Sequence, residues 1–206
     1  MLQSRRLQAG SGAALDCPLP CETAPWETPA VDSGALRDEF LGLSDYVWQR
    51  LADRLVGLTD AEYLWEPVSG CWNIRPGPAG LWELDFIRPE PDPKPVTTIA
   101  WRLAHLTTDI RFRPWLGLEP RSERAQATVP LTAQTAVAAV LATMAERHED
   151  LLEMTDVALW EPIGAIGGVF AESTRVAWVL HILDEVIHHG AEIALLRDLF
   201  CAKYVS

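Results

Sequence analysis

Basic residues are scarce in this chain. Its 206 residues include 17 Lys and Arg against 29 Asp and Glu, which gives a formal net charge of -12. No run of Lys and Arg occurs anywhere in the sequence. General nucleic-acid binding needs a concentrated basic surface that displaces counterions. The charge therefore argues against nucleic acid as a partner, and we expect a small-molecule substrate instead.

Long apolar runs are also missing. No stretch approaches the roughly 20 apolar residues that a membrane-spanning helix needs. Small and polar residues follow Arg5 and Arg6, where a secretory signal would require a hydrophobic segment. Hydrophobic residues make up 49% of the chain, which is typical of a globular protein. We expect a cytoplasmic protein with no membrane partner.

Cysteine is too rare and too scattered for a disulfide framework, with single residues at positions 17, 21, 71 and 201. Cys17 and Cys21 could form half of a zinc site, but no second Cys/His pair completes it. Cys71 is interpreted as an inert, half-buried thiol, although it could in principle add a ligand to a site built by other residues. Nucleotide-binding loops, CxxC pairs and a Ser-His-Asp order are absent as well.

Helical periodicity begins only after residue 31. Residues 1–31 are rich in Ala, Gly, Pro and Ser and are predicted to form a flexible tail, whereas residues 32–206 are predicted to form one domain. Apolar residues at steps of three and four predict four helices in that domain, and no strand pattern competes with them. The predicted fold class is all-α, a four-helix bundle with long crossover connections.

The four predicted helices begin after residues that cap helix N-termini. They run from Ser33 to about Gly57, from Ile99 to about Trp115, from Thr132 to about Glu153, and from Ser173 onward. Val137, Val140, Leu141, Met144 and Leu151 are predicted to form the buried side of the third helix.

A four-residue motif occurs twice, as Leu64-Trp65-Glu66-Pro67 and as residues 159–162. A Thr-Asp pair precedes each copy, at 59–60 and at 155–156, and Thr59-Asp-Ala-Glu62 has the form of a capping box. The repetition suggests two related helix pairs, with a chance match of four residues as the alternative.

The last helix carries a cluster of histidines and carboxylates. Residues four apart share a helix face, so Glu185 and His189 point the same way, and His181 lies one turn earlier. An imidazole and a carboxylate at this spacing suit a divalent cation. His148 lies in the charged run Glu-Arg-His-Glu-Asp and is interpreted as part of a solvated helix face.

A third ligand could come from His105, in the middle of the second helix. If that helix packs beside the last one, His105, Glu185 and His189 form a triad that leaves coordination positions open, as in catalytic zinc sites. Nickel or ferrous iron would suit the same donors. The alternative is that His105 is a buried imidazole satisfied by hydrogen bonds and that His188-His189 is a polar surface.

Two helical stretches resemble the hallmark helices of the DinB superfamily: TTIAWRLAHLTTDIRFRPWLG and HILDEVIHHGAEIALLRDLF. The segment YLWEPVSGCWNIRP resembles the region that follows the first helix in many members, and the similarity covers about residue 34 to the end. The resemblance implies a metal-binding, up-down-down-up four-helix bundle that commonly pairs as a homodimer. The family's usual ligands are one histidine in the second helix and a His-x3-His pair in the last. His105 and His189 match this set, and Glu185 departs from it.

The Glu-x3-His variant resembles the mycothiol-dependent maleylpyruvate isomerase branch of the superfamily, in which the metal is zinc. This resemblance implies an enzyme that uses a low-molecular-weight thiol, either an S-transferase or an isomerase. Asp109, one turn after His105, and His181 are then candidates for proton transfer. Two alternatives stay open: a non-catalytic, metal-stabilised or small-molecule-binding bundle related to stress, and a metal-dependent hydrolase.

Overall fold

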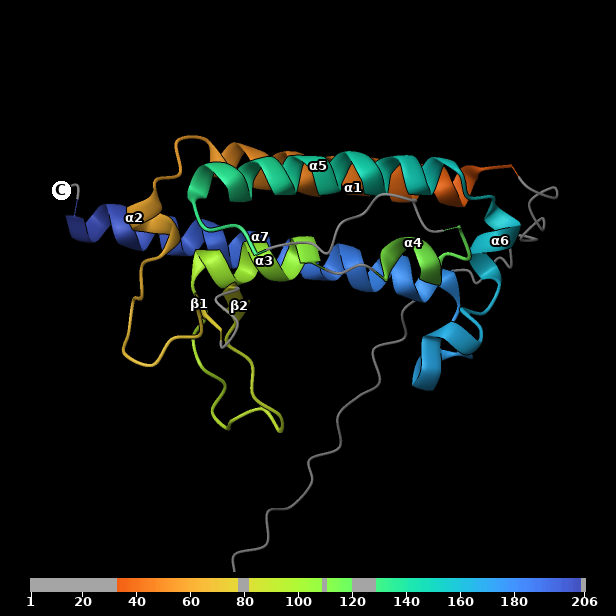
Figure 1. The fold of residues 1–206 in the computed structure, drawn as a ribbon. Helices are drawn as coiled ribbons and strands as arrows, with labels where there is room; N and C mark the ends of the chain where they lie inside the picture. Colours follow the sequence, from red (N-terminus) through yellow and green to blue (C-terminus); the bar gives the residue numbers. More distant parts are fainter. Residues whose placement is uncertain (1–32, 78–81, 109–110, 120–128, 205–206) are drawn as a thin grey trace, which may run out of the picture. The chain divides into compact units, whose positions relative to one another are not determined.

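The computed structural model describes residues 33–77, 82–108, 111–119 and 129–204 (Figure 1). The predicted tail, with Cys17 and Cys21, and the predicted catalytic residue Asp109 lie outside the described residues. Helices dominate the described part of the chain, which confirms the all-α fold class. The main helices are α1 (Ala35–Leu55), α3 (Ile99–Thr108), α5 (Ala133–Leu152) and α7 (Arg175–Tyr204).

Shorter elements join the main helices. They are α2 (Asp60–Tyr63), α4 (Phe112–Trp115), α6 (Asp156–Trp160) and the 3-10 helix η1 (Ala165–Phe170). Two strands, β1 (Ile74–Pro76) and β2 (Trp82–Leu84), pair antiparallel with Ile74 opposite Leu84. The sequence analysis expected no strand, and this was wrong because three-residue strands are too short to show an alternating pattern.

Two aspartates connect α1 and α5 at their opposite ends. Asp60, after the end of α1, accepts a hydrogen bond of 2.7 Å from the N–H of Ala133 at the start of α5. Asp156, after the end of α5, accepts one of 3.0 Å from the N–H of Arg37 at the start of α1. The two helices are therefore antiparallel, and each carries a carboxylate at its N-terminus, where the helix dipole favours negative charge.

Each copy of the repeated motif follows one of these two aspartates in the sequence. Thr59 caps α2, which ends just before the first motif copy, and Thr155 caps α6, which includes the first two residues of the second copy. The predicted capping box of Thr59 and Glu62 is present. Glu66 forms an ion pair with Arg75, and Glu161 forms one with Arg175. The two copies thus lie at opposite ends of the α1–α5 pair, and two related helix pairs stay a prediction.

Helix α7 packs along both α1 and α3. Arg54, near the end of α1, donates to the carbonyl of Ala194 at 2.8 Å and pairs with Asp198, so the second half of α7 lies at the end of α1. His105 of α3 contacts Glu185, whereas the earlier Arg102 contacts the later Glu192, so α3 runs antiparallel to α7. Figure 1 shows α1 and α5 side by side, with α3 and α7 beneath them.

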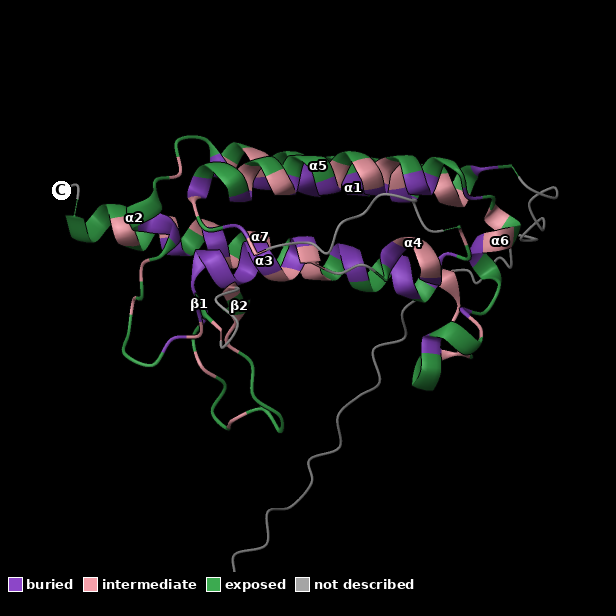
Figure 2. Cartoon of the chain, in the orientation of Figure 1, coloured by how far each residue is buried: buried purple, intermediate pink, exposed green. Residues whose placement is uncertain are grey.

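The core lies between the four main helices, whose facing sides are buried (Figure 2). Its fully buried side chains include Leu51, Leu103, Val140, Val179 and Ile193. The predicted buried side of α5 is only partly right. Val140 and Leu151 are buried, but Leu141 is 47% exposed.

The buried side of α5 also includes charged side chains. Arg147 and Asp150 are buried there. Arg147 donates to the carbonyl of Leu106 at 3.0 Å, and Asp150 pairs with Arg113. The charged run at 146–150 was expected to form a solvated helix face, and this was wrong for Arg147 and Asp150, because partners inside the fold compensate their charges.

The predicted second and fourth helices differ at their ends. The second is described as two helices, α3 ending at Thr108 and α4 beginning at Phe112. Residues 109–110, between these two helices, lie outside the described residues. The last helix is capped by Thr174, whose Oγ1 accepts from the N–H of Ala177 at 3.2 Å, one residue later than predicted.

Candidate metal centre

Helices α3 and α7 bring His105, Glu185 and His189 together. Nε2 of His105 lies 2.7 Å from Oε2 of Glu185, and Nε2 of His189 lies 3.3 Å from the same oxygen. One donor atom from each residue lies within 4.8 Å of the other two. The antiparallel register produces this arrangement, because His105 on α3 faces the turn of α7 that carries both Glu185 and His189.

The three side chains are not enclosed equally. The side chain of His105 is 42% exposed and that of Glu185 is 27% exposed, whereas that of His189 is 11% exposed. The group therefore sits at the edge of the helix interface, with one side anchored in the bundle. Such a position leaves room for a ligand to approach from solvent.

The local electrostatics favour the protonation states that bind metals. Hydrogen bonds from His105 and His189 hold the pKa of Glu185 well below its usual range, so it is a carboxylate. Burial lowers the pKa of His189, so its imidazole is neutral at physiological pH. A metal ligand must offer a lone pair, and both the ionised Glu185 and the neutral His189 have one available.

Trp101 fixes the ring of His105. The two rings stack with centroids 5.1 Å apart and an interplanar angle of 11°. The indole N–H of Trp101 donates to the carbonyl of Asp85 at 2.8 Å, which ties the tryptophan to the segment after β2. His105 is thereby held on one face by a ring that is itself anchored.

Glu192 and Arg102 support His189 from the other side. Oε2 of Glu192 lies 2.9 Å from Nδ1 of His189, and Arg102 forms an ion pair with the same carboxylate. Arg102 is 6% exposed, and burial lowers its pKa to about 10, which still leaves it charged at neutral pH. The sequence analysis gave Glu192 no role, although its spacing of three residues from His189 places the two on one face.

A second group of possible donors shares His189. His188, His189 and Glu192 also have donor atoms within 4.8 Å of one another. Arg102 already places a buried positive charge on Glu192, however, which opposes the binding of a cation there. Among the described residues, no Lys or Arg forms an ion pair with Glu185, so the His105, Glu185 and His189 group is the better candidate.

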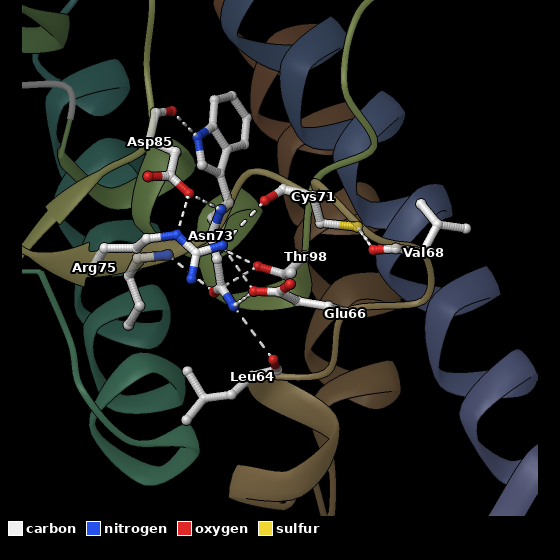
Figure 3. Close-up of polar contacts among 10 residues, drawn as sticks. Leu64, Glu66, Val68, Cys71, Asn73, Arg75, Asp85 and Thr98 are labelled. Atoms are coloured by element: carbon white, nitrogen blue, oxygen red, sulfur yellow. Dashed lines mark hydrogen bonds and ion pairs between the residues drawn. The ribbon is translucent and has the colours of Figure 1, made fainter.

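The other sequence-derived candidates lie apart from this group. His181 is exposed on α7, with its ring 5.5 Å from that of Trp178, so its role in proton transfer stays a prediction. His148 lies 2.9 Å from Asp45 on α1, as a polar surface residue. The thiol of Cys71 is buried and donates to the carbonyl of Val68 at 3.0 Å (Figure 3), and it is not part of the donor group.

Comparisons with known proteins place the chain in a family. Within the described residues, no helix combines the length and apolar character needed to cross a bilayer. No curated protein matches the chain. A crystal structure of a conserved protein from Enterococcus faecalis aligns with 82% of this chain and 98% of that chain, at 15% sequence identity and a TM-score of 0.48. The family model described as the DinB superfamily matches residues 44–193. Because that match spans well over half of the sequence, the chain belongs to the DinB superfamily.

Proposed function

We propose that His105, Glu185 and His189 bind one divalent cation, and that the protein is an enzyme acting on a low-molecular-weight thiol. The observation that carries the proposal is the convergence of three donor atoms within 4.8 Å at a partly exposed position. Two histidines and one carboxylate leave coordination positions open, which is the feature of catalytic rather than structural sites.

The donor set fits a borderline cation of the first transition row. Two imidazoles and one carboxylate suit zinc, nickel and ferrous iron alike. We propose zinc first because the thiol-dependent branch that the sequence resembles uses zinc. The ionised Glu185 and the neutral His189 are the forms that such a cation requires. Cys71 is outside the group, so no fourth protein ligand closes the site among the described residues.

A divalent cation bound here would lower the pKa of a thiol at its open position and so favour the nucleophilic thiolate. Neighbouring side chains orient and cover the proposed ligands. Oε2 of Glu192 and Nη1 of Arg102 lie 2.9 and 3.4 Å from Nδ1 of His189, and these contacts hold the ring with Nε2 directed at the site. Trp101 covers one face of the His105 ring and keeps water from that face. We propose His181 and Asp109 as groups that transfer protons, and these assignments stay predictions.

The preference for thiol transfer or isomerisation over hydrolysis comes from the Glu-x3-His pattern of Glu185 and His189. The same pattern occurs in the thiol-dependent branch that the sequence resembles. A hydrolase would need a general base close to a bound water. A purely structural metal site would be closed, which the 42% exposure of His105 disfavours. A small-molecule-binding bundle without turnover would have the same open site, so it stays the second candidate. A cytoplasmic location remains a prediction of the sequence, and a homodimer remains a prediction of the resemblance.

Substitution with cobalt(II) tests whether a thiol reaches the site. We expect the cobalt-loaded protein to develop a sulfur-to-cobalt charge-transfer band when a small thiol such as N-acetylcysteine is added. N-acetylserine should give no such band, and neither should cobalt-treated Glu185→Ala. A cobalt-loaded wild type whose spectrum does not respond to any thiol would contradict the thiol-dependent function, while leaving the metal site itself intact.

A further inference from the structure

A cavity lies in the connection between α2 and α3, outside the metal centre. It has a volume of about 500 Å³ and is formed by the two strands and their flanking residues. Trp72 and Phe86 supply aromatic wall, and Arg75, Glu83 and Asp85 supply polar wall. None of the three candidate metal ligands contributes to it. The volume lies within the range of pockets that hold small organic molecules.

Hydrogen bonds fix the polar side of the cavity before any ligand binds (Figure 3). Arg75 donates from Nε to Asp85 and from Nη2 to Glu66, each at 2.8 Å. Asn73 donates to Glu66 at 3.2 Å and accepts from the hydroxyl of Thr98 at 2.9 Å. These contacts connect the strands to the residues before α3, so the cavity is largely preformed.

The charges around the cavity sum to a negative value. Arg75 stands between two carboxylates, those of Glu66 and Asp85, so this group has a net charge of about -1. Hydrogen bonds from Asn73 and Arg75 lower the pKa of Glu66 and keep it ionised. Glu83 is opposite Arg75 in the strand pair and forms no ion pair with any described residue. A cationic ligand is therefore favoured here over an anionic one.

The aromatic wall suits a cation as well. The rings of Trp72 and Phe86 lie 5.6 Å apart and are tilted by 48°. The guanidinium of Arg88 lies 5.1 Å from the centroid of Phe86, so the chain already places one cation on this ring. Phe86 is 48% exposed, so part of its ring is accessible to a ligand. Cation–π contact and apolar burial thus act together at this wall.

We propose that this cavity binds an organic amine, with the ammonium group at Glu83 and the apolar body against Trp72 and Phe86. The site is distinct from the metal centre, and its occupation does not depend on a bound metal. The two are nevertheless neighbours. Trp72 lies 5.9 Å from Trp101, the ring that stacks on His105.

Calorimetric titration with three probes of matched shape tests this proposal. The probes are benzylamine, benzyl alcohol and benzoate, which differ in charge but share a ring. We expect benzylamine to bind wild-type protein with one site per chain, benzyl alcohol to bind more weakly, and benzoate to bind least. Glu83→Gln should weaken benzylamine by about fivefold, the scale of one partly exposed charge pair, and leave benzyl alcohol unchanged. Phe86→Ala should weaken both.

Two controls separate this site from the rest of the chain. Glu90→Gln removes an exposed charge from the same connection, one that pairs with Lys94 and does not line the cavity, and should bind benzylamine like wild type. Glu185→Ala should also bind benzylamine normally, whatever its metal content. The proposal is overturned if benzylamine does not bind saturably, if the three probes bind equally, or if Glu83→Gln and Glu90→Gln behave alike.

Discussion

Oε2 of Glu192 lies 2.9 Å from Nδ1 of His189, whereas Nε2 of the same ring faces Glu185 at 3.3 Å. Glu192 therefore holds the ring of His189 with its Nε2 directed at Glu185. We expect Glu192→Gln to weaken zinc binding by about 10- to 100-fold, the usual effect of losing a carboxylate behind a ligating histidine. Competition with a chromophoric chelator measures this affinity directly.

Asp184→Asn is a suitable control for that experiment. Asp184 is exposed, lies on the same helix and is adjacent to Glu185, so it removes the same charge without touching His189. Its zinc affinity should stay close to that of wild type. Equal losses in Asp184→Asn and Glu192→Gln would mean that net charge matters, and that the orientation of His189 does not.

Arg102 and Glu192 are expected to be coupled in stability. Arg102 is buried and pairs with Glu192, so Arg102→Met leaves the carboxylate with less compensation. We expect this variant to lose about 3 kcal/mol of unfolding free energy in chemical denaturation. The double variant Arg102→Met/Glu192→Gln should lose less than the sum of the two single losses. Strict additivity would show that the ion pair contributes nothing to folding.

Removing Asp60 and removing Asp156 should each lower the unfolding free energy independently. Asp60→Ala and Asp156→Ala each remove a carboxylate from the N-terminus of α5 or α1, and each should lower the unfolding free energy by about 1 kcal/mol. The effects should add within about 0.5 kcal/mol, because the two sites lie at opposite ends of the helix pair. Glu39→Ala, on the exposed side of α1, should change stability little. Losses no larger than that of Glu39→Ala would contradict the capping roles.

The contribution of Glu62 to the unfolding free energy is expected to be lost in acid. Burial acts to raise its pKa, but hydrogen bonds from the N–H of Thr59 and from Arg197 lower it more, so the folded pKa lies below the ordinary 4.5. A depressed pKa contributes stability above the unfolded value, and this is lost as the pH falls through the folded pKa. Glu62→Gln should therefore lose about 1–3 kcal/mol near neutral pH, and the difference from wild type should shrink below pH 4.5. Thermal melts from neutral pH to about pH 3 measure it, and a constant difference would contradict this role.

The main helices and the candidate metal ligands on α7 could be predicted from the sequence. Helical periodicity located the four main helices. Thr132 showed where α5 starts and Thr59 showed where the short α2 starts, because capping is a local interaction. The spacing of Glu185 and His189 placed them on one face. Their meeting with His105 depended on the packing of α3 against α7, for which the resemblance to the family was needed.

What the sequence did not show depends on contacts between distant segments. The hairpin of β1 and β2 is held by Asn73 and Arg75 through partners before and after it in the chain. Arg147 and Asp150 are charged residues, yet they are buried because partners from other elements satisfy them. The link from Arg102 through Glu192 to His189 likewise joins two helices. No local pattern specifies such contacts.

Metal content tests the central claim most directly. Protein purified without an affinity tag is analysed for zinc, nickel and iron, beside Glu185→Ala and the matched surface variant His148→Ala. The account predicts about one ion per chain in wild type and in His148→Ala, and a strong loss in Glu185→Ala. Wild-type protein that holds no metal even after reconstitution, or a Glu185→Ala variant that keeps its full complement, would contradict a metal centre at His105, Glu185 and His189.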